Sequence, residues 1–199
     1  MTIIGIDYSL TCPCVCVSNN KNFEDSYFHF LTDTKKHTGQ YLENILGDLH
    51  DEYLTDQQRY ENIASWVLNI IEPLPKANLT ILIEDYAFAA KGRVFNLAEN
   101  CGLLKYLLYK REYNFHTVAP SVIKKHATGK GNANKELMYA SFENLTGVDL
   151  IGAYGSAKGG KVNSPITDII DSFYLAHWMW DNQKSEKIDR GTNKRAEGK

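Results

Sequence analysis

The sequence predicts one α/β domain built around a mixed β-sheet, and three observations lead to this fold class. Three short apolar segments joined by tight turns open the chain, which favours an antiparallel meander. The later run Leu79–Glu84 is almost continuously apolar, as expected of a strand buried on both faces. Helical periodicity dominates the rest of the chain to about residue 181. Strands that alternate with helices in this way indicate a layered α/β domain.

The three opening strands are expected over residues 2–8, 13–18 and 22–31, where β-branched, aromatic or small apolar residues are bounded by turn residues. Cysteines alternate at positions 12, 14 and 16, immediately before and within the second strand. In a strand these share one face at a spacing of roughly 6.6 Å, so the outer two are too far apart to close one tetrahedral zinc site without a sharp bend. We interpret them, and Cys101 in a later helical pattern, as small core residues.

Two helices are predicted between the meander and the central strand. Apolar residues at helical spacing predict the first over residues 41–53. The second begins at Thr55 or Asp56, either of which can cap it, and ends near Ile71 before two prolines.

The second half of the chain is predicted to be mainly helical. Its elements are a helix over 94–112, a strand over 113–118, a short helix opened by Ala119-Pro120-Ser121, and helices over 133–145 and 165–181. Residues 128–132 and 147–164 contain glycines and little periodicity, so we expect loops. The domain is expected to cover residues 1–182, followed by a basic, disordered tail over 183–199.

Composition places the chain among globular proteins. It has 199 residues, of which 43% are hydrophobic and 23% charged. It lacks an apolar run long enough to span a bilayer, and its first residues lack the basic region of a signal peptide. We therefore expect a cytoplasmic protein without membrane contact.

Charge is distributed unevenly although the formal net charge is only −2. Residues 105–135 contain seven Lys or Arg and one acid, whereas residues 41–61 contain six acids and one Arg. A protein that is slightly acidic overall can still present a local positive surface.

Four carboxylates occupy positions that disfavour acids. Asp7 ends the first strand, Glu84 ends the central strand, and Asp168 and Asp171 lie on a largely apolar helix. Buried acids are usually paired or bind a cation. Each of them singly could be a cap or a lysine partner, but four acids from three core elements favour a shared site.

A pair of magnesium ions would account for this negative charge. Asp168 and Asp171 are three residues apart, so they share a helix face and repel each other. Mg²⁺ takes oxygen ligands and keeps several waters. Two ions about 3.5–4 Å apart can hold a phosphodiester, one activating the attacking water and the other stabilising the leaving oxygen. Asp85 is a weaker candidate because it points to the opposite side of the strand from Glu84. The residues alone leave metal binding and ion pairing both open.

Four segments in order resemble the RuvC-like Holliday-junction resolvases of the RNase H-like (retroviral integrase) superfamily. The third of them resembles the phage-type members, and the fourth is similar to the D-x-x-D opening of the family's last helix. The resemblance spans residues 2–180. The segments are Ile4-Gly5-Ile6-Asp7-Tyr8-Ser9, Ile81-Leu82-Ile83-Glu84, residues 119–125 with 128–135, and Asp168-Ile169-Ile170-Asp171-Ser172.

The resemblance implies an RNase H-like fold with a five-stranded mixed sheet flanked by helices on both sides. It implies a crossover junction endodeoxyribonuclease that cuts four-way DNA junctions as a homodimer, in the host-cell cytoplasm if the chain is phage-encoded. The site would hold two Mg²⁺ ions, for which Mn²⁺ can substitute. The catalytic metal ligands carried over are Asp7, Glu84, Asp168 and Asp171. Two departures from the family pattern are present. The 147–164 segment is long, and Tyr86 and Phe88 flank the position of the family's base-contacting aromatic residue without aligning to it.

The basic residues then predict a DNA surface, because phosphate attraction dominates DNA affinity. Gly129 and Gly131 would let the main chain approach a phosphate, although an ordinary turn is also possible. The spacing is not that of a P-loop, so no nucleotide cofactor is expected. The predicted DNA contacts are Lys91, Arg93, Lys124, Lys125, Lys130, Lys135, Tyr86 and Phe88.

A dimer interface is expected on the helix over residues 94–112, because this helix has more apolar surface than a single contact with the core would bury. The residues that suggest it are Leu97, Cys101, Leu104, Leu108 and Tyr109. We expect His116, His126 and His177 to be structural or surface residues rather than ligands.

Two other functions stay open. An RNase H-like nuclease acting on RNA in hybrids, or on DNA ends during packaging, would use the same acids. The second alternative is a junction-binding protein that no longer cuts, and the presence of all four acids argues against it. An actin-like nucleotide-binding fold needs two lobes, for which 199 residues are too few.

Overall fold

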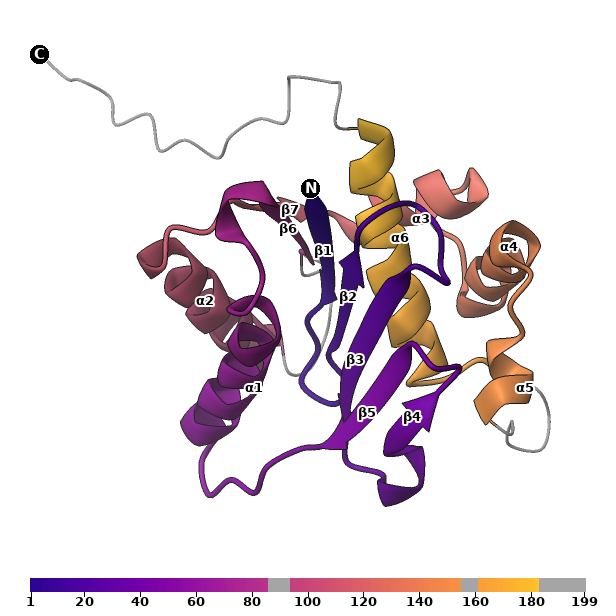
Figure 1. Cartoon of the computed structure of the whole chain (residues 1–199). Coiled ribbons are helices and arrows are strands. Elements are labelled where there is room, and N and C mark those ends of the chain that lie inside the picture. The colour runs from indigo at the N-terminus through magenta and orange to yellow at the C-terminus, as the bar shows by residue number, and fades with distance from the viewer. Residues whose placement is uncertain (86–93, 155–160, 183–199) are drawn as a thin grey trace, which may run out of the picture.

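A seven-stranded mixed sheet separates two layers of helices (Figure 1). The computed structural model describes residues 1–85, 94–154 and 161–182. The strand order is β4-β5-β3-β2-β1-β6-β7. The strands are β1 (Thr2–Asp7), β2 (Cys14–Ser18), β3 (Ser26–Thr32), β4 (Gly39–Tyr41), β5 (Ile45–Leu49), β6 (Leu79–Glu84) and β7 (Phe115–Val118).

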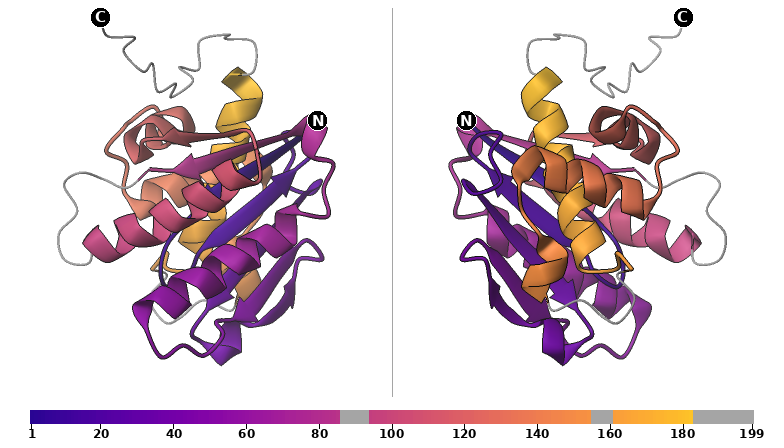
Figure 2. Two further views of the ribbon diagram at one scale, coloured as in Figure 1. Left: turned by 90° about the vertical axis from the view of Figure 1, so that its left-hand side faces the viewer. Right: turned by 90° about the vertical axis from the view of Figure 1, so that its right-hand side faces the viewer.

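The helices lie on both sides of the sheet, as predicted. Figure 2 shows α1 and α2 across one face in its left view, and the layer that contains α6 over the other face in its right view. The helices are α1 (Asp56–Ile71), α2 (Val94–Lys110), α3 (Pro120–Thr128), α4 (Lys135–Thr146), α5 (Leu150–Tyr154) and α6 (Ile166–Asn182), with short 3-10 turns at Lys35–His37 and Lys76–Asn78.

Strand pairing brings two acid-bearing strand ends together. The strands β1, β2 and β3 form the predicted antiparallel meander. On its other side β1 pairs in parallel with β6, with Ile6 opposite Ile83. Because the two strands run in the same direction, the residues that follow, Asp7 and Glu84, lie side by side at the carboxyl edge of the sheet.

The predicted count of five strands and the predicted helix over residues 41–53 are both wrong. That segment contains β4 and β5, and β5 pairs in parallel with β3. Ile45 and Gly47 face inward while Leu46 is 38% exposed, which is the alternation of a strand. The apolar spacing matched a helix only because Leu42 and Leu46, although hydrophobic, lie on the exposed side.

Other element boundaries agree with the sequence within a few residues. The side chain of Thr55 caps α1 by accepting a hydrogen bond from the N–H of Gln58. The predicted loop over 147–164 contains the short helix α5, so that expectation is wrong in part. Residues 155–160 of this segment and the predicted tail over 183–199 lie outside the described residues.

The buried side chains form two clusters, one on each face of the sheet. Cys12, Cys14 and Cys16 belong to the cluster under α6, as expected for residues that share one face of β2 and its approach. Cys101 lies in the other cluster, beneath α1 and α2. In the part of the chain that the structure describes, no helix is long and apolar enough to cross a membrane.

The helix α6 touches the sheet at backbone distance. It packs on β1 and β2, and a Cβ atom added to Gly5 in β1 would lie under 3.0 Å from the carbonyl oxygen of Ser172 and 2.8 Å from the backbone nitrogen of Ala176. Only glycine permits this approach. The first turn of α6 is thereby held beside the carboxyl end of β1.

Candidate active site

Four carboxylates from three elements meet at the carboxyl edge of the sheet. Asp7 ends β1, Glu84 ends β6, and Asp168 and Asp171 lie in the first two turns of α6. An open cavity of about 340 Å³ is lined by Asp7, Glu84 and Asp171, together with Lys124 from α3. The structure thus brings together the four acids that the sequence singled out.

Burial and mutual repulsion raise the pKa of these acids. Burial raises the pKa of Asp7 well above its usual range, and the charges of Asp168, Glu84 and Asp171 raise it further. Burial and the charge of Asp171 raise the pKa of Glu84 to about 8. Burial and the charge of Asp168 raise the pKa of Asp171 to about 7. The protein therefore concentrates more negative charge here than its own cations neutralise.

Two lysines partly offset this charge. Lys124 lowers the pKa of both Glu84 and Asp171, and Lys135 lowers that of Asp171. A second cavity of about 290 Å³ is lined by Lys124, Lys135, Asn134 and Asp171. Because the two cavities share Lys124 and Asp171, a path that contains both lysines, called the basic path below, continues from the carboxylates toward the start of α4, where Glu136 also lines it.

Asp168 differs from the other three acids. It is 8% exposed, and its carboxylate accepts hydrogen bonds from its own backbone N–H and from the side chains of Ser164, Thr167 and Cys12. Burial raises its pKa in spite of these bonds. Asp168 therefore also caps the first turn of α6, a role that the sequence left open.

The remaining residues that the sequence singled out lie in different places. Asp85 lines the first cavity beside Glu84, which its expected orientation did not predict, and it forms an ion pair with Lys105 at 3.3 Å. Lys125 and Lys130 are exposed, and neither lines the two cavities. Gly129 adopts φ 79° and caps α3, so a helix end alone explains that glycine. Four predicted DNA contacts, Tyr86, Phe88, Lys91 and Arg93, lie outside the described residues.

Sequence reasoning missed several residues that line the cavities. Tyr8 and Ser9 directly follow Asp7, and Leu97, Cys101 and Pro120 also line the first cavity. Asn134 lines the second cavity and also caps α4 by accepting a hydrogen bond from the N–H of Leu137. Their only sequence signal is proximity to residues already chosen, which is too weak to assign a role.

The raised pKa of Glu84 predicts a pH-dependent stability for the metal-free protein. Between pH about 4.5 and 8 the folded chain holds a proton that the unfolded chain releases, so the free energy of unfolding falls as the pH rises through this window. The variant Glu84→Gln has no such proton to lose. It should be more stable than the wild type at pH 8 by on the order of 2 kcal/mol, with little difference at pH 4.5.

Urea denaturation of chelator-treated protein at the two pH values measures this effect. Glu61→Gln, which removes an exposed acid on α1, is the matched control and should change little at either pH. A Glu84→Gln variant that is less stable than the wild type at pH 8 would contradict the prediction.

Comparison with solved structures identifies the fold of the chain. No protein-family model and no curated protein matches the chain. Solved structures do match it. Thermus thermophilus RuvC in complex with a Holliday junction substrate superposes with a TM-score of 0.58 at 14% identity, covering 92% of this chain and 96% of that one. The chain has the RuvC-type resolvase fold.

Two further structures carry the same fold. Thermus thermophilus RuvC in another structure gives a TM-score of 0.55 at 16% identity, with 92% of this chain and 95% of that chain covered. The fowlpox virus resolvase in complex with Holliday junction DNA gives 0.50 at 13% identity, with 92% and 99% covered. The similarity confirms the RuvC-like resemblance drawn from the four sequence segments.

Proposed function

We propose that this protein is a structure-selective endonuclease that resolves four-way and other branched DNA junctions by magnesium-dependent hydrolysis. One observation carries the proposal: four carboxylates from β1, β6 and α6 converge in a RuvC-type fold, and three of them, Asp7, Glu84 and Asp171, line an open cavity together with Lys124. Two of the similar structures are complexes with Holliday junction DNA. The corresponding activity is that of a crossover junction endodeoxyribonuclease.

The donor set fits magnesium. All four side chains offer carboxylate oxygens, which Mg²⁺ and Mn²⁺ accept. The acids raise one another's pKa because their negative charges repel. Added positive charge would therefore stabilise their ionised forms. Asp7, Glu84, Asp168 and Asp171 would hold two ions, and bound divalent ions supply Lewis acidity and lower the pKa of bound water.

The protein's own groups position the DNA strand. Lys124 lines the first cavity with Glu84 and Asp171 and can pair with a phosphate at the edge of the acidic cluster. Lys135 extends this positive charge along the second cavity. The first cavity is open to solvent.

Cleavage of several substrates side by side tests the proposal. The substrates are a synthetic four-way junction, a flap, an RNA–DNA hybrid and a plain duplex, each with Mg²⁺. We expect the junction to be cut fastest, by paired nicks in opposed strands. Faster cutting of the hybrid or of duplex ends would favour another RNase H-like nuclease, and tight junction binding without any cutting would favour a binding protein.

The basic path predicts how binding depends on salt. Replacing Lys124, Lys130 or Lys135 with Ala should weaken junction binding and reduce the slope of log affinity against log salt by about one unit per lost phosphate contact. Lys76→Ala is the matched control because Lys76 lies just before β6, at the end of that strand opposite to Glu84. Unchanged slopes for all three variants would remove this segment from the DNA surface.

A homodimer through α2 is part of the proposal, with a corrected interface. Cys101, Leu104 and Leu108 are buried in the core, and Leu97 lines the first cavity, so these four residues are not free for a partner. The exposed stripe of α2 consists instead of Phe95 (82% exposed), Tyr106 (56%) and Tyr109 (70%). Their spacing places them on one helix face.

Light scattering tests the dimer. We expect twice the chain mass for the wild type and monomers for a Phe95→Asp, Tyr106→Lys variant, because charges would be buried in the interface. Tyr27→Lys, at an exposed aromatic residue of β3, should stay dimeric. A monomeric wild type, even with junction DNA, would contradict the prediction and favour a nuclease that makes single cuts.

A further inference from the structure

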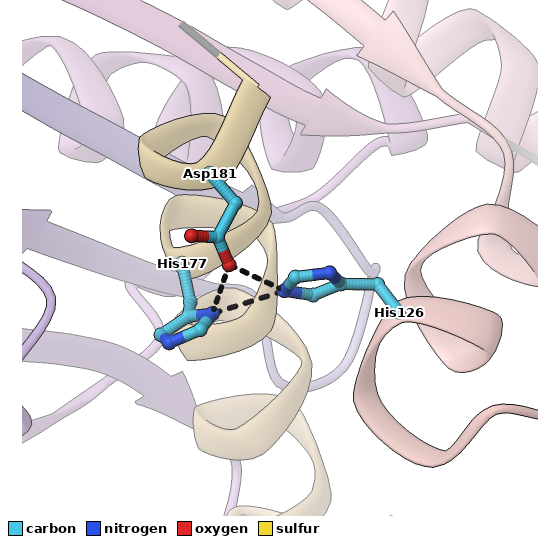
Figure 3. A group of neighbouring side chains, drawn as sticks. All are labelled: His126, His177 and Asp181. Atoms are coloured by element: carbon cyan, nitrogen blue, oxygen red, sulfur yellow. Dashed lines mark hydrogen bonds and ion pairs between the residues drawn. The ribbon is translucent and has the colours of Figure 1, made fainter.

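Two histidines and an aspartate meet at the end of α6 that is remote from the carboxylate site (Figure 3). His177 and Asp181 lie one turn apart on α6, and His126 reaches them from the last turn of α3. Asp171 and Asp181 are ten residues apart on this helix, which is about 15 Å along its axis. The cluster is therefore separate from the proposed catalytic site.

The three donor atoms form a compact triangle. His126 Nε2 lies 2.9 Å from His177 Nδ1 and 3.6 Å from Asp181 Oδ2, and His177 Nδ1 lies 3.5 Å from the same oxygen. Zinc with ligands at about 2.0–2.1 Å in tetrahedral geometry separates its ligand atoms by about 3.3 Å. The triangle thus has the dimensions of one face of a zinc coordination tetrahedron.

We propose that His126, His177 and Asp181 bind one Zn²⁺ ion, which fastens α3 to α6. Imidazole nitrogen suits Zn²⁺ and related transition metals, whereas Mg²⁺ prefers all-oxygen sites. The chemistry of the donors therefore separates this site from the four carboxylates. A water molecule takes the fourth position.

The carboxylate of Asp181 is already oriented for this role. Its Oδ1 accepts a hydrogen bond from the ammonium of Lys21, while its Oδ2 faces both imidazoles. Partners that hold a ligand through its second oxygen fix its direction toward the metal. Lys21 lies between β2 and β3, so the site would tie three separate parts of the chain together.

Both imidazoles are partly enclosed, which favours neutral nitrogen ligands. Their side chains are 19% and 15% exposed, for His126 and His177, and burial lowers the pKa of each. Without a metal, the same atoms can form a simple hydrogen bond between the rings. The two possibilities differ in their response to zinc.

A zinc site here would act on the proposed DNA surface through α3. That helix carries Lys124 in its second turn and His126 in its last. An ion that joins His126 to α6 would hold Lys124 in place beside Glu84 and Asp171, although it would contact neither DNA nor the carboxylates.

Zinc titration of the chelator-treated full chain, with Mg²⁺ in excess, tests the proposal. Calorimetry should give one Zn²⁺ per chain, and Zn²⁺ at about 100 times its Kd should raise the Tm by roughly 5–10 °C. Co²⁺ in the same protein should give the intense visible absorption of tetrahedral coordination. His126→Gln and His177→Gln should each weaken zinc binding by more than the roughly 10–100-fold typical of losing an outer partner.

Matched variants make the outcome decisive. His29→Gln and His37→Gln remove histidines outside the cluster and should bind zinc like the wild type. Asp7→Asn should also keep the site, which excludes zinc in the carboxylate cavity. Asp181→Asn removes a ligand charge without shortening a side chain and should weaken binding even where circular dichroism shows an intact fold. A wild-type Kd weaker than about 10 µM, or zinc binding unchanged in folded His126→Gln and His177→Gln, would overturn the proposal.

Discussion

Replacing Asp7, Glu84 or Asp171 with the matching amide should reduce junction cleavage by about 10³-fold or more while junction affinity stays within a few-fold. Removing one group that stabilises transition-state charge already costs about 10²–10³-fold in rate, and in the proposed mechanism each of these acids would also help to hold the metal ions. Binding survives because DNA affinity arises mainly from lysines and phosphates. Asp168 is a poorer test, since its carboxylate also accepts hydrogen bonds at the start of α6.

Single-turnover cleavage and a gel-shift titration on the same junction measure the two quantities. Glu61→Gln, an exposed acid on α1, should cut and bind like the wild type. Glu84→Gln gives the sharpest result, because it is expected to be inactive yet more stable than the wild type without metal at pH 8. Near wild-type cleavage by Asp7→Asn would show that the site assignment is wrong.

Gly5→Ala should destabilise the protein by about 3 kcal/mol or more. The added methyl group would collide with the backbone of α6 at Ser172 and Ala176, and backbone cannot move aside as a side chain can. Overpacking of a well-filled core typically costs about 1–3 kcal/mol, and this position lies at the upper end. For a chain of this size the Tm should fall by roughly 6–12 °C.

Gly102→Ala is the matched control for this prediction. Gly102 lies in α2, where an added Cβ meets nothing within 4 Å. Alanine should there stabilise the helix by about 0.5–1 kcal/mol. Thermal melts of both variants at one protein concentration decide the matter, and equal Tm shifts would contradict the close approach of β1 and α6.

The sequence predicted the elements whose local pattern and tertiary role agree. Leu79–Glu84 is buried on both faces and was identified with the correct bounds, and α1 begins at its predicted cap. The segment that became β4 and β5 was misread because its apolar spacing fits a helix. Pairing of β5 with β3 decides its structure, and that contact lies outside any local window.

The candidate site was predictable in part for a similar reason. An acid at the end of an apolar strand can be recognised locally, so Asp7 and Glu84 stood out. The convergence of Lys135 with Asp171 depends on how α4 and α6 pack, and the sequence does not encode it in a short motif. The same holds for His126 and His177, which are 51 residues apart and meet only after α3 docks.

The close packing of α6 on β1 also governs the order in which the protein can mature on the ribosome. Among the described elements α6 is synthesised last, yet it covers β1, β2, β3 and β6. Until it emerges, the nascent sheet exposes an apolar face that includes Cys14, Cys16 and Phe28, which invites aggregation or chaperone binding. Two of the four acids, Asp168 and Asp171, are also missing at that stage, so a partly synthesised chain carries an incomplete candidate site.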